Sequence, residues 1–263
     1  MTNFLSNFFK KPSVAPSSSP LDSKDNPEKV NPPQVVSLPA SLNTPQAFDA
    51  MKALLGNSFD PVILDVGAHC GETAFRFNEV FQRPEIHSFE PFRESHARLA
   101  ENTNEWENIK AYDFGLSDSN GLKEFHSNPS SATNSILATD KQGPSTWSEG
   151  LLETEEVITA NFKTLDAFMA ESNLPKINIL KIDVQGAEHL VLKGAKETIA
   201  KRKIDLIYTE IIIQPTYVGQ NRLDVALKNF YDAGFDLYNV FNLSLTRDGR
   251  LRQLDAIFTV KLT

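Results

Sequence analysis

The run PVILDVGAHCGETA, from Pro61 to Ala74, constrains the fold of this chain more than any other stretch. Its first part, 62–66, is a short apolar and β-branched run, typical of a strand buried on both faces. Two glycines, Gly67 and Gly71, bracket the turn that follows, and an amphipathic segment then begins at Glu72. A strand, a glycine turn and a helix N-terminus together form a place where a ligand can lie against bare backbone.

Apolar strands alternate with amphipathic helices along the rest of the chain, which predicts an α/β fold. We expect a doubly wound, mostly parallel, seven-stranded Rossmann-like sheet. The periodicity predicts strands at 62–66, 85–90, 109–115, 177–183, 204–213, 235–241 and 253–260, and helices at 72–82, 92–103, 164–171, 187–200 and 223–233. The turn-like RDGR at 247–250 makes the last two strands an antiparallel hairpin. A short extra strand is expected at 157–162.

The first part of the chain has a different composition from the rest. Eight of the fifteen prolines lie within the first 45 residues, among serines and charged residues with little to bury. Residues 1–43 are therefore predicted to be a flexible Pro/Ser-rich tail. Thr44 and Pro45 suit the N-cap and first position of a helix, so one folded domain is expected over 44–263.

Charge and cysteine content exclude several classes of protein. The 263 residues carry a formal net charge of -8, which disfavours sequence-independent binding to the phosphate backbone of nucleic acid. The single cysteine, Cys70, excludes an intrachain disulfide and suits a reducing compartment. No apolar run reaches the roughly 18 residues of a transmembrane helix. We therefore expect a cytoplasmic protein without a nucleic-acid partner.

Acidic residues stand at the ends of four predicted strands, where open α/β sheets bind their ligands. They are Asp65, Glu90, Asp183 and Glu210. Asp65 can accept a hydrogen bond from an amine or hydroxyl, and Glu90 can accept from both hydroxyls of a ribose. Helix capping also places acids at strand ends, but the ordered pair Asp65 and Glu90 beside a glycine turn favours a binding function.

Two alternative functions stay open at this point. One is a nicotinamide-dependent oxidoreductase, because Glu90 follows Gly71 by about the interval at which dinucleotide-binding folds place a ribose-binding acid. Against it, the turn lacks the middle glycine of G-x-G-x-x-G, and His69 leaves less room for a pyrophosphate. The other is a non-catalytic module that keeps the fold for partner binding.

Five motifs resemble those of the FkbM-type methyltransferases, over roughly residues 60–215. They are DVGAHCG at 65–71, FEP at 89–91, GLSD at 115–118, VLKG at 191–194 and, above all, ILKIDVQGAE at 179–188. The resemblance implies the class I methyltransferase fold, a parallel sheet finished by a hairpin, with S-adenosylmethionine as cofactor. It implies O-methylation, usually of a hydroxyl on a sugar, glycan or polyketide-type product. We predict an O-methyltransferase acting on a sugar, glycan or glycosylated metabolite.

The resemblance also implies roles for individual residues toward the cofactor. Those expected near its methionine portion belong to the glycine turn: Asp65, Gly67, Ala68, His69, Gly71 and Thr73. Glu90 would hold the ribose hydroxyls, and Gly115 and Leu116 the adenine. His69 departs from the family pattern, in which Asn is commoner.

Lys181 and Asp183 would lie beside the transferable methyl group, and with Glu210 they form the predicted catalytic set. Because the sulfonium is already an activated donor, the enzyme mainly aligns the acceptor oxygen and helps to remove a proton. Asp183 is the candidate base, or it orients the acceptor. Alternatively, Asp183 and Glu210 share a divalent cation such as Mg²⁺ that acidifies the hydroxyl.

Residues 120–156 are too long for an ordinary loop, which suggests an irregular, substrate-facing lid. Its polar candidates for a polyhydroxyl acceptor are Ser130, Ser131, Asn134 and Ser135, and Trp147 is placed to stack on a sugar face. A mobile surface insertion is an equal alternative. The segment 214–217 is a second candidate rim element.

Overall fold

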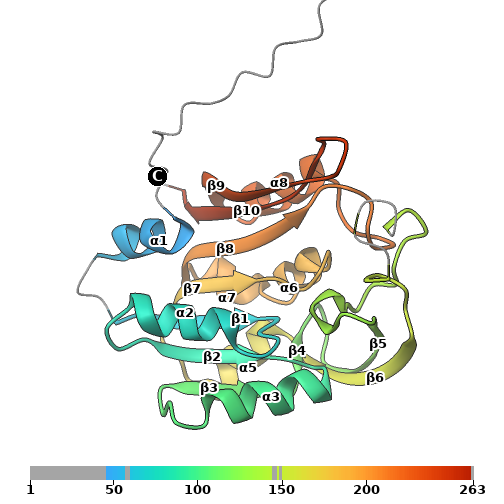
Figure 1. Ribbon diagram of the computed structural model, residues 1–263. Coiled ribbons are helices and arrows are strands. Elements are labelled where there is room, and N and C mark those ends of the chain that lie inside the picture. The colour runs from blue at the N-terminus through green and yellow to red at the C-terminus, as the bar shows by residue number, and fades with distance from the viewer. Residues whose placement is uncertain (1–45, 57–59, 144–146, 148–149, 262–263) are drawn as a thin grey trace, which may run out of the picture. The chain divides into compact units, whose positions relative to one another are not determined.

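The structure, a computed structural model, describes residues 46–56, 60–143, 147 and 150–261. Thr44–Thr263 forms one compact unit, in which seven strands make a single sheet in the order β3-β2-β1-β7-β8-β10-β9 (Figure 1). The predicted tail at 1–43 and the predicted cap at 44–45 lie outside the described residues. Within the described ranges, no helix has the length and apolar character needed to cross a membrane.

Parallel pairing dominates the sheet. β1 pairs in parallel with β2 and β7, β2 with β3, and β7 with β8, whereas β10 is antiparallel to both β8 and β9. The strands are β1 (Val62–Val66), β2 (Glu85–Phe89), β3 (Ile109–Tyr112), β7 (Ile177–Ile182), β8 (Ile204–Ile212), β9 (Phe235–Leu245) and β10 (Leu251–Val260). The predicted doubly wound, mostly parallel sheet with a C-terminal antiparallel hairpin is confirmed.

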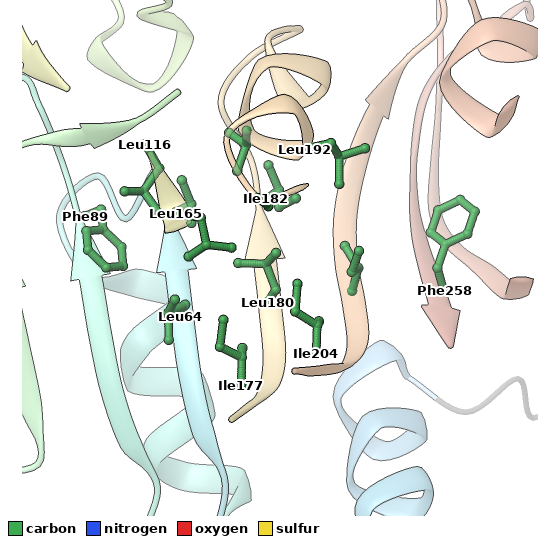
Figure 2. Packing of buried hydrophobic residues seen from close by; sticks show 14 of the residues in the cluster. Leu64, Phe89, Leu116, Leu165, Ile177, Leu180, Ile182, Leu192, Ile204 and Phe258 are labelled. Atoms are coloured by element: carbon green, nitrogen blue, oxygen red, sulfur yellow. The ribbon is translucent and has the colours of Figure 1, made fainter. Parts of the chain in front are cut away.

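Helices cover both faces of the sheet because strand side chains alternate between the two faces. Ile63 of β1 belongs to a core that includes residues of α1 and α2, whereas Leu64 belongs to the core that includes residues of α5, α6 and α8 (Figure 2). The helices are α1 (Ala47–Leu55), α2 (Glu72–Val80), α3 (Arg93–Thr103), α5 (Leu165–Ser172), α6 (Glu188–Lys193), α7 (Lys196–Ala200) and α8 (Leu223–Asp232). Burying each large aliphatic side chain in these cores contributes about 1.5–3 kcal/mol.

A second sheet of three strands, in the order β4-β6-β5, corrects two sequence-based predictions. Its strands are β4 (Gly115–Leu116), β5 (Gly121–Ser127) and β6 (Glu156–Lys163). Gly115 therefore does not end the strand that begins at 109, and residues 121–127 are not irregular. β5 buries only Phe125, so it lacks the apolar alternation that marks a strand. The extra strand predicted at 157–162 is confirmed as β6.

The single helix predicted over 187–200 is wrong, because the chain forms α6 and α7 with a break at Gly194. The Gly194 carbonyl accepts a hydrogen bond from the Asp166 backbone, and a Cβ on Gly194 would lie 2.1 Å from the carbonyl oxygen of Ser117. The Asp166 carboxylate then accepts from the backbone N–H of Thr198 at 2.8 Å, near the start of α7. Packing against α5 thus overrides the helical periodicity.

Candidate active site

A cavity of about 360 Å³ lies beyond the carboxyl ends of β1, β2 and β7, where open α/β sheets bind ligands. Its volume is in the range of small-molecule sites, roughly 300–1,000 Å³. Nine of the predicted site residues line it: Gly67, Ala68, His69, Thr73, Glu90, Gly115, Leu116, Lys181 and Asp183. Asp65, Gly71 and Glu210 do not line it.

The glycine turn after β1 forms the floor of this cavity. Gly67 has a φ of +76°, and a Cβ there would lie 1.9 Å from the carbonyl oxygen of Asp183, so no larger residue fits. The backbone N–H groups of Gly67 and Ala68 both donate to the Phe89 carbonyl at 3.0 Å. His69 also has a left-handed φ, +48°, a conformation that histidine tolerates better than most residues. The turn is therefore held over the end of β2.

Glu90 lies just after β2 and is 7% exposed. Its carboxylate accepts hydrogen bonds from the backbone N–H groups of His69 and Phe92, each at 2.9 Å. Burial raises the pKa of Glu90 to about 7, although these two hydrogen bonds act in the opposite direction. Each carboxylate oxygen keeps a second lone pair, so Glu90 can also accept hydrogen bonds from a ligand.

A buried ion pair joins β1 and β7 behind the turn. The Nζ atom of Lys181 lies 2.9 Å from Oδ1 of Asp65 and donates to the Gly67 carbonyl at 2.7 Å. Burial lowers the pKa of Lys181, but Asp65 and Asp183 together raise it above its ordinary value, so the ammonium stays charged. Asp65 is fully buried and lies out of reach of the cavity, because its carboxylate faces Lys181. The pair supports the turn from behind.

Asp183 and Glu210 are brought together by a residue that the sequence-based prediction missed. The amide nitrogen of Gln185 donates to Oδ1 of Asp183 and to Oε2 of Glu210, both at 2.9 Å. Burial, and then the charge of Asp183, raise the pKa of Glu210 well above its ordinary value. Gln185 stands inside the 179–188 motif, but no local pattern indicates that its amide bridges two strands.

The two carboxylates do not fit the predicted divalent cation. The Gln185 nitrogen already contacts an oxygen of each, and Mg²⁺ would need those oxygens at about 2.0–2.1 Å. Among the described residues, potential metal-ligand atoms of three side chains come within 4.8 Å of one another at His69, Cys70 and Glu72. His69 there is already bonded to Glu72 and Ser131.

A smaller cavity of about 90 Å³ adjoins the first and shares Thr73, Lys181 and Asp183 with it. Its remaining lining residues are Phe48, Ile182, Tyr208, Glu210 and Asp255. The Tyr208 hydroxyl donates to Asp255 at 2.6 Å, and Asn242 donates to the same oxygen at 2.7 Å. Carboxylate and hydroxyl groups of this kind suit a ligand that offers several hydroxyl donors.

The segment after β5 contributes to the first cavity through Ser131, Asn134 and Ile136. The Ser131 hydroxyl lies 2.8 Å from Nε2 of His69, so this segment contacts the glycine turn directly. Trp147 lines neither cavity, because its indole N–H donates to Thr216 and the Arg252 guanidinium lies over its ring. The expected stacking of Trp147 on a sugar therefore has no support from the structure.

Two phenylalanines of the small sheet, Phe125 and Phe162, also line the first cavity and were not predicted to do so. They pack together with Ile136 in a separate apolar cluster. Their strands are separated in the chain by residues 128–155 and pair with Gly121 opposite Phe162, so no local sequence signal places them at the site. The cavity therefore combines a polar floor with an apolar side.

Comparisons with known proteins assign the chain to a family. The model of the family described as Methyltransferase FkbM domain matches residues 65–237. The 2-O-methyltransferase NoeI of Sinorhizobium fredii is 33% identical over 167 residues, which are 61% of this chain and 67% of NoeI. The hexuronic acid methyltransferase AglP of Haloferax volcanii is 29% identical over 153 residues, 58% of this chain and 56% of AglP.

Solved structures are similar at a lower level. The methyltransferase FkbM from Methylobacillus flagellatus KT gives a TM-score of 0.43 at 13% identity, over 76% of this chain and 43% of that chain. The family match spans the strand-end residues from Asp65 to Glu210, and it favours a methyltransferase over the oxidoreductase and the non-catalytic module. The chain belongs to the family of FkbM methyltransferase domains.

Proposed function

We propose that this chain transfers a methyl group from S-adenosylmethionine to a hydroxyl oxygen of a sugar, glycan or glycosylated metabolite. Family membership supports methyl transfer, and the names of the relatives NoeI and AglP support a carbohydrate-type acceptor. One observation carries the proposal: the cofactor-sized cavity and the carboxylate-lined cavity meet at Lys181 and Asp183. A cytoplasmic location and the lack of a nucleic-acid partner, inferred from the cysteine content and the charge, belong to the same proposal.

The larger cavity offers matching groups for each part of S-adenosylmethionine. Backbone groups of the turn from Gly67 to His69 would face the methionine portion. Glu90 would accept from the ribose hydroxyls, because its carboxylate is fixed by two backbone N–H groups. The adenine would lie between Leu116 and the apolar side formed by Phe125 and Phe162.

The smaller cavity would hold the acceptor. S-adenosylmethionine, when bound, supplies an activated methyl group on a positively charged sulfur. Asp183 accepts the proton of the attacking hydroxyl as the oxygen–methyl bond forms and the methyl–sulfur bond breaks. Asp255 and Tyr208 bind other hydroxyls of the acceptor and align it for in-line attack. Lys181 holds the Gly67 carbonyl and so fixes the turn.

The test measures binding first and turnover second. Calorimetry with S-adenosylhomocysteine and with NAD should give binding of the first compound only. The chain is then incubated with S-adenosylmethionine and a panel of neutral and acidic glycosides, and S-adenosylhomocysteine formation and O-methylated products are measured. Asp183→Asn should lower turnover by about 100-fold or more with unchanged S-adenosylhomocysteine affinity. Binding of NAD without S-adenosylhomocysteine would overturn the proposal.

A further inference from the structure

Gln185 adopts a backbone conformation that is unfavourable for its side chain. Its φ is +54°, in the left-handed region that residues with a Cβ rarely adopt, and it is 9% exposed. Ser135, from the segment after β5, donates its hydroxyl to the Gln185 carbonyl at 2.8 Å. Such strain persists where surrounding contacts hold it, and it is concentrated at functional sites.

The contacts of the Gln185 side chain fix the orientation of its amide. The Tyr217 hydroxyl shares its single proton between the Thr133 carbonyl, at 2.8 Å, and the Gln185 amide oxygen, at 3.1 Å. The opposite orientation would place the amide oxygen against two carboxylates, which are acceptors only when ionised. The NH₂ group therefore points at Asp183 and Glu210, with one N–H available for each.

These contacts give Gln185 the position that a bridging cation would occupy. Both carboxylates are hydrogen-bonded to the same nitrogen at 2.9 Å, and the other oxygen of Glu210 accepts from the Gln253 amide. A cation shared by these oxygens would displace the amide, because the two cannot occupy the same space. The positive end of the amide dipole reduces the repulsion between the two carboxylates, as a cation would.

We propose that Gln185 is a positioning residue that stands in place of a divalent cation, so that Asp183 is oriented for methyl transfer without a metal. Oδ1 of Asp183 is held by the amide, and Oδ2 lies 3.8 Å from the Lys181 ammonium. The Asp183 carboxylate is thereby oriented by a hydrogen bond from the Gln185 amide on one oxygen and by the charge of Lys181 near the other. The role in catalysis rests on the proposed function, whereas the exclusion of a metal does not.

The experiment titrates Mn²⁺ into the full chain saturated with S-adenosylhomocysteine, with bound metal counted by electron paramagnetic resonance. The wild type should bind no Mn²⁺ at this position. Gln185→Glu places a third carboxylate between Asp183 and Glu210, and it should bind one Mn²⁺ per chain, at least about 10-fold more tightly than any residual Mn²⁺ binding elsewhere on the wild type. Gln214→Glu is the matched control, because Gln214 donates to the Leu251 carbonyl and to neither carboxylate, and it should behave as the wild type.

Turnover of a variant with a truncated Gln185 side chain and turnover after chelation are measured next. Gln185→Ala should lower turnover with little change in the KM for S-adenosylmethionine, and exhaustive chelation should leave wild-type turnover unchanged. One Mn²⁺ per wild-type chain, lost in Asp183→Asn, would overturn the proposal, as would a Gln185→Glu variant that folds and gains no metal. If the wild type and every variant lack turnover while the metal results are as expected, the proposed function is contradicted and the exclusion of a metal is not.

Discussion

One side of the larger cavity comes from the seven-stranded sheet and the other from the small sheet and the segment that follows β5. The first, the sheet wall, consists of Gly67, Ala68, Glu90, Lys181 and Asp183. The second, the lid wall, consists of Phe125, Ser131, Asn134, Ile136 and Phe162.

The two walls differ in how they are supported. All six residues of β7 are buried, and a buried ion pair links β7 to β1. β5, by contrast, buries only Phe125 among its seven residues. The sheet wall is therefore held by the main core, whereas the lid wall has one small apolar cluster and is otherwise held by hydrogen bonds such as that from Ser135 to the Gln185 carbonyl. Substitutions in the sheet wall should cost more stability than matched substitutions in the lid wall.

The largest effect is expected from Lys181→Met, which leaves Asp65 buried without its partner. Removing one member of a buried ion pair costs about 3–5 kcal/mol. The measurement is the free energy of unfolding in urea, with and without S-adenosylhomocysteine. The double variant Asp65→Leu/Lys181→Met removes both charges and should recover part of the loss. Equal losses for the single and double variants would show that the ion pair is not the cause.

The second prediction compares two glycines with positive φ. In the sheet wall, Gly67→Ala meets the Asp183 carbonyl at 1.9 Å, and we expect a loss of about 3 kcal/mol together with loss of S-adenosylhomocysteine binding. In the small sheet, Gly121 has a φ of +119° but no heavy atom within 4 Å of an added Cβ. Gly121→Ala should therefore cost about 1 kcal/mol. Similar costs at both positions would contradict the expected difference in stability between the glycine turn of the sheet wall and the small sheet that carries the lid wall.

The third prediction concerns pH and Glu90. Because burial places the pKa of Glu90 at about 7, the carboxyl is mostly protonated at pH 6 and mostly ionised at pH 8. The ionised form accepts from both ribose hydroxyls, so S-adenosylhomocysteine affinity should rise with pH, by at most about 10-fold. Since Glu90 binds its proton more tightly in the folded state, its contribution to stability should fall as the pH rises from 4.5 to 7.

Calorimetry of the Glu90→Gln variant separates this effect from titration of the ligand's own amino group. That group titrates with either protein, whereas Glu90 titrates only in the wild type. Glu188→Gln is the matched control, because burial also raises the pKa of Glu188 to about 7. Glu188 instead accepts from the backbone N–H groups of Val184 and Gly186, outside the proposed ribose contact. A pH dependence that persists in Glu90→Gln would rule out the ribose contact.

The smallest effect is expected in the lid wall, from Ser131→Ala. This change removes the hydroxyl that contacts His69 and should cost about 1 kcal/mol or less, measured by thermal unfolding and by S-adenosylhomocysteine affinity. Ser130→Ala is a suitable control, because the described structure shows no hydrogen bond from the Ser130 hydroxyl. A loss of several kcal/mol from Ser131→Ala would show that substitutions in the lid wall cost as much as those in the sheet wall.

The sheet wall was largely predictable because its signals are local. The strand, glycine turn and helix N-terminus follow one another within 62–80, and parallel strand ends meet at one edge by topology. The lid wall was not predictable in the same way, because β5 pairs with β6 across a long intervening segment of the chain. The break at Gly194 and the bridge made by Gln185 depend on side chains and carbonyls from distant parts of the chain.

The hydrogen bond between His69 and Ser131 joins the glycine turn to the segment after β5, and both residues line the larger cavity. If the cofactor enters and leaves between these two elements, the contact has to open before S-adenosylhomocysteine can leave and before the next S-adenosylmethionine can bind. Segment motions of this kind take place on microsecond to millisecond timescales. The rate at which this contact opens would then set an upper limit on the turnover rate. Ser131→Ala would shorten the residence time of the product.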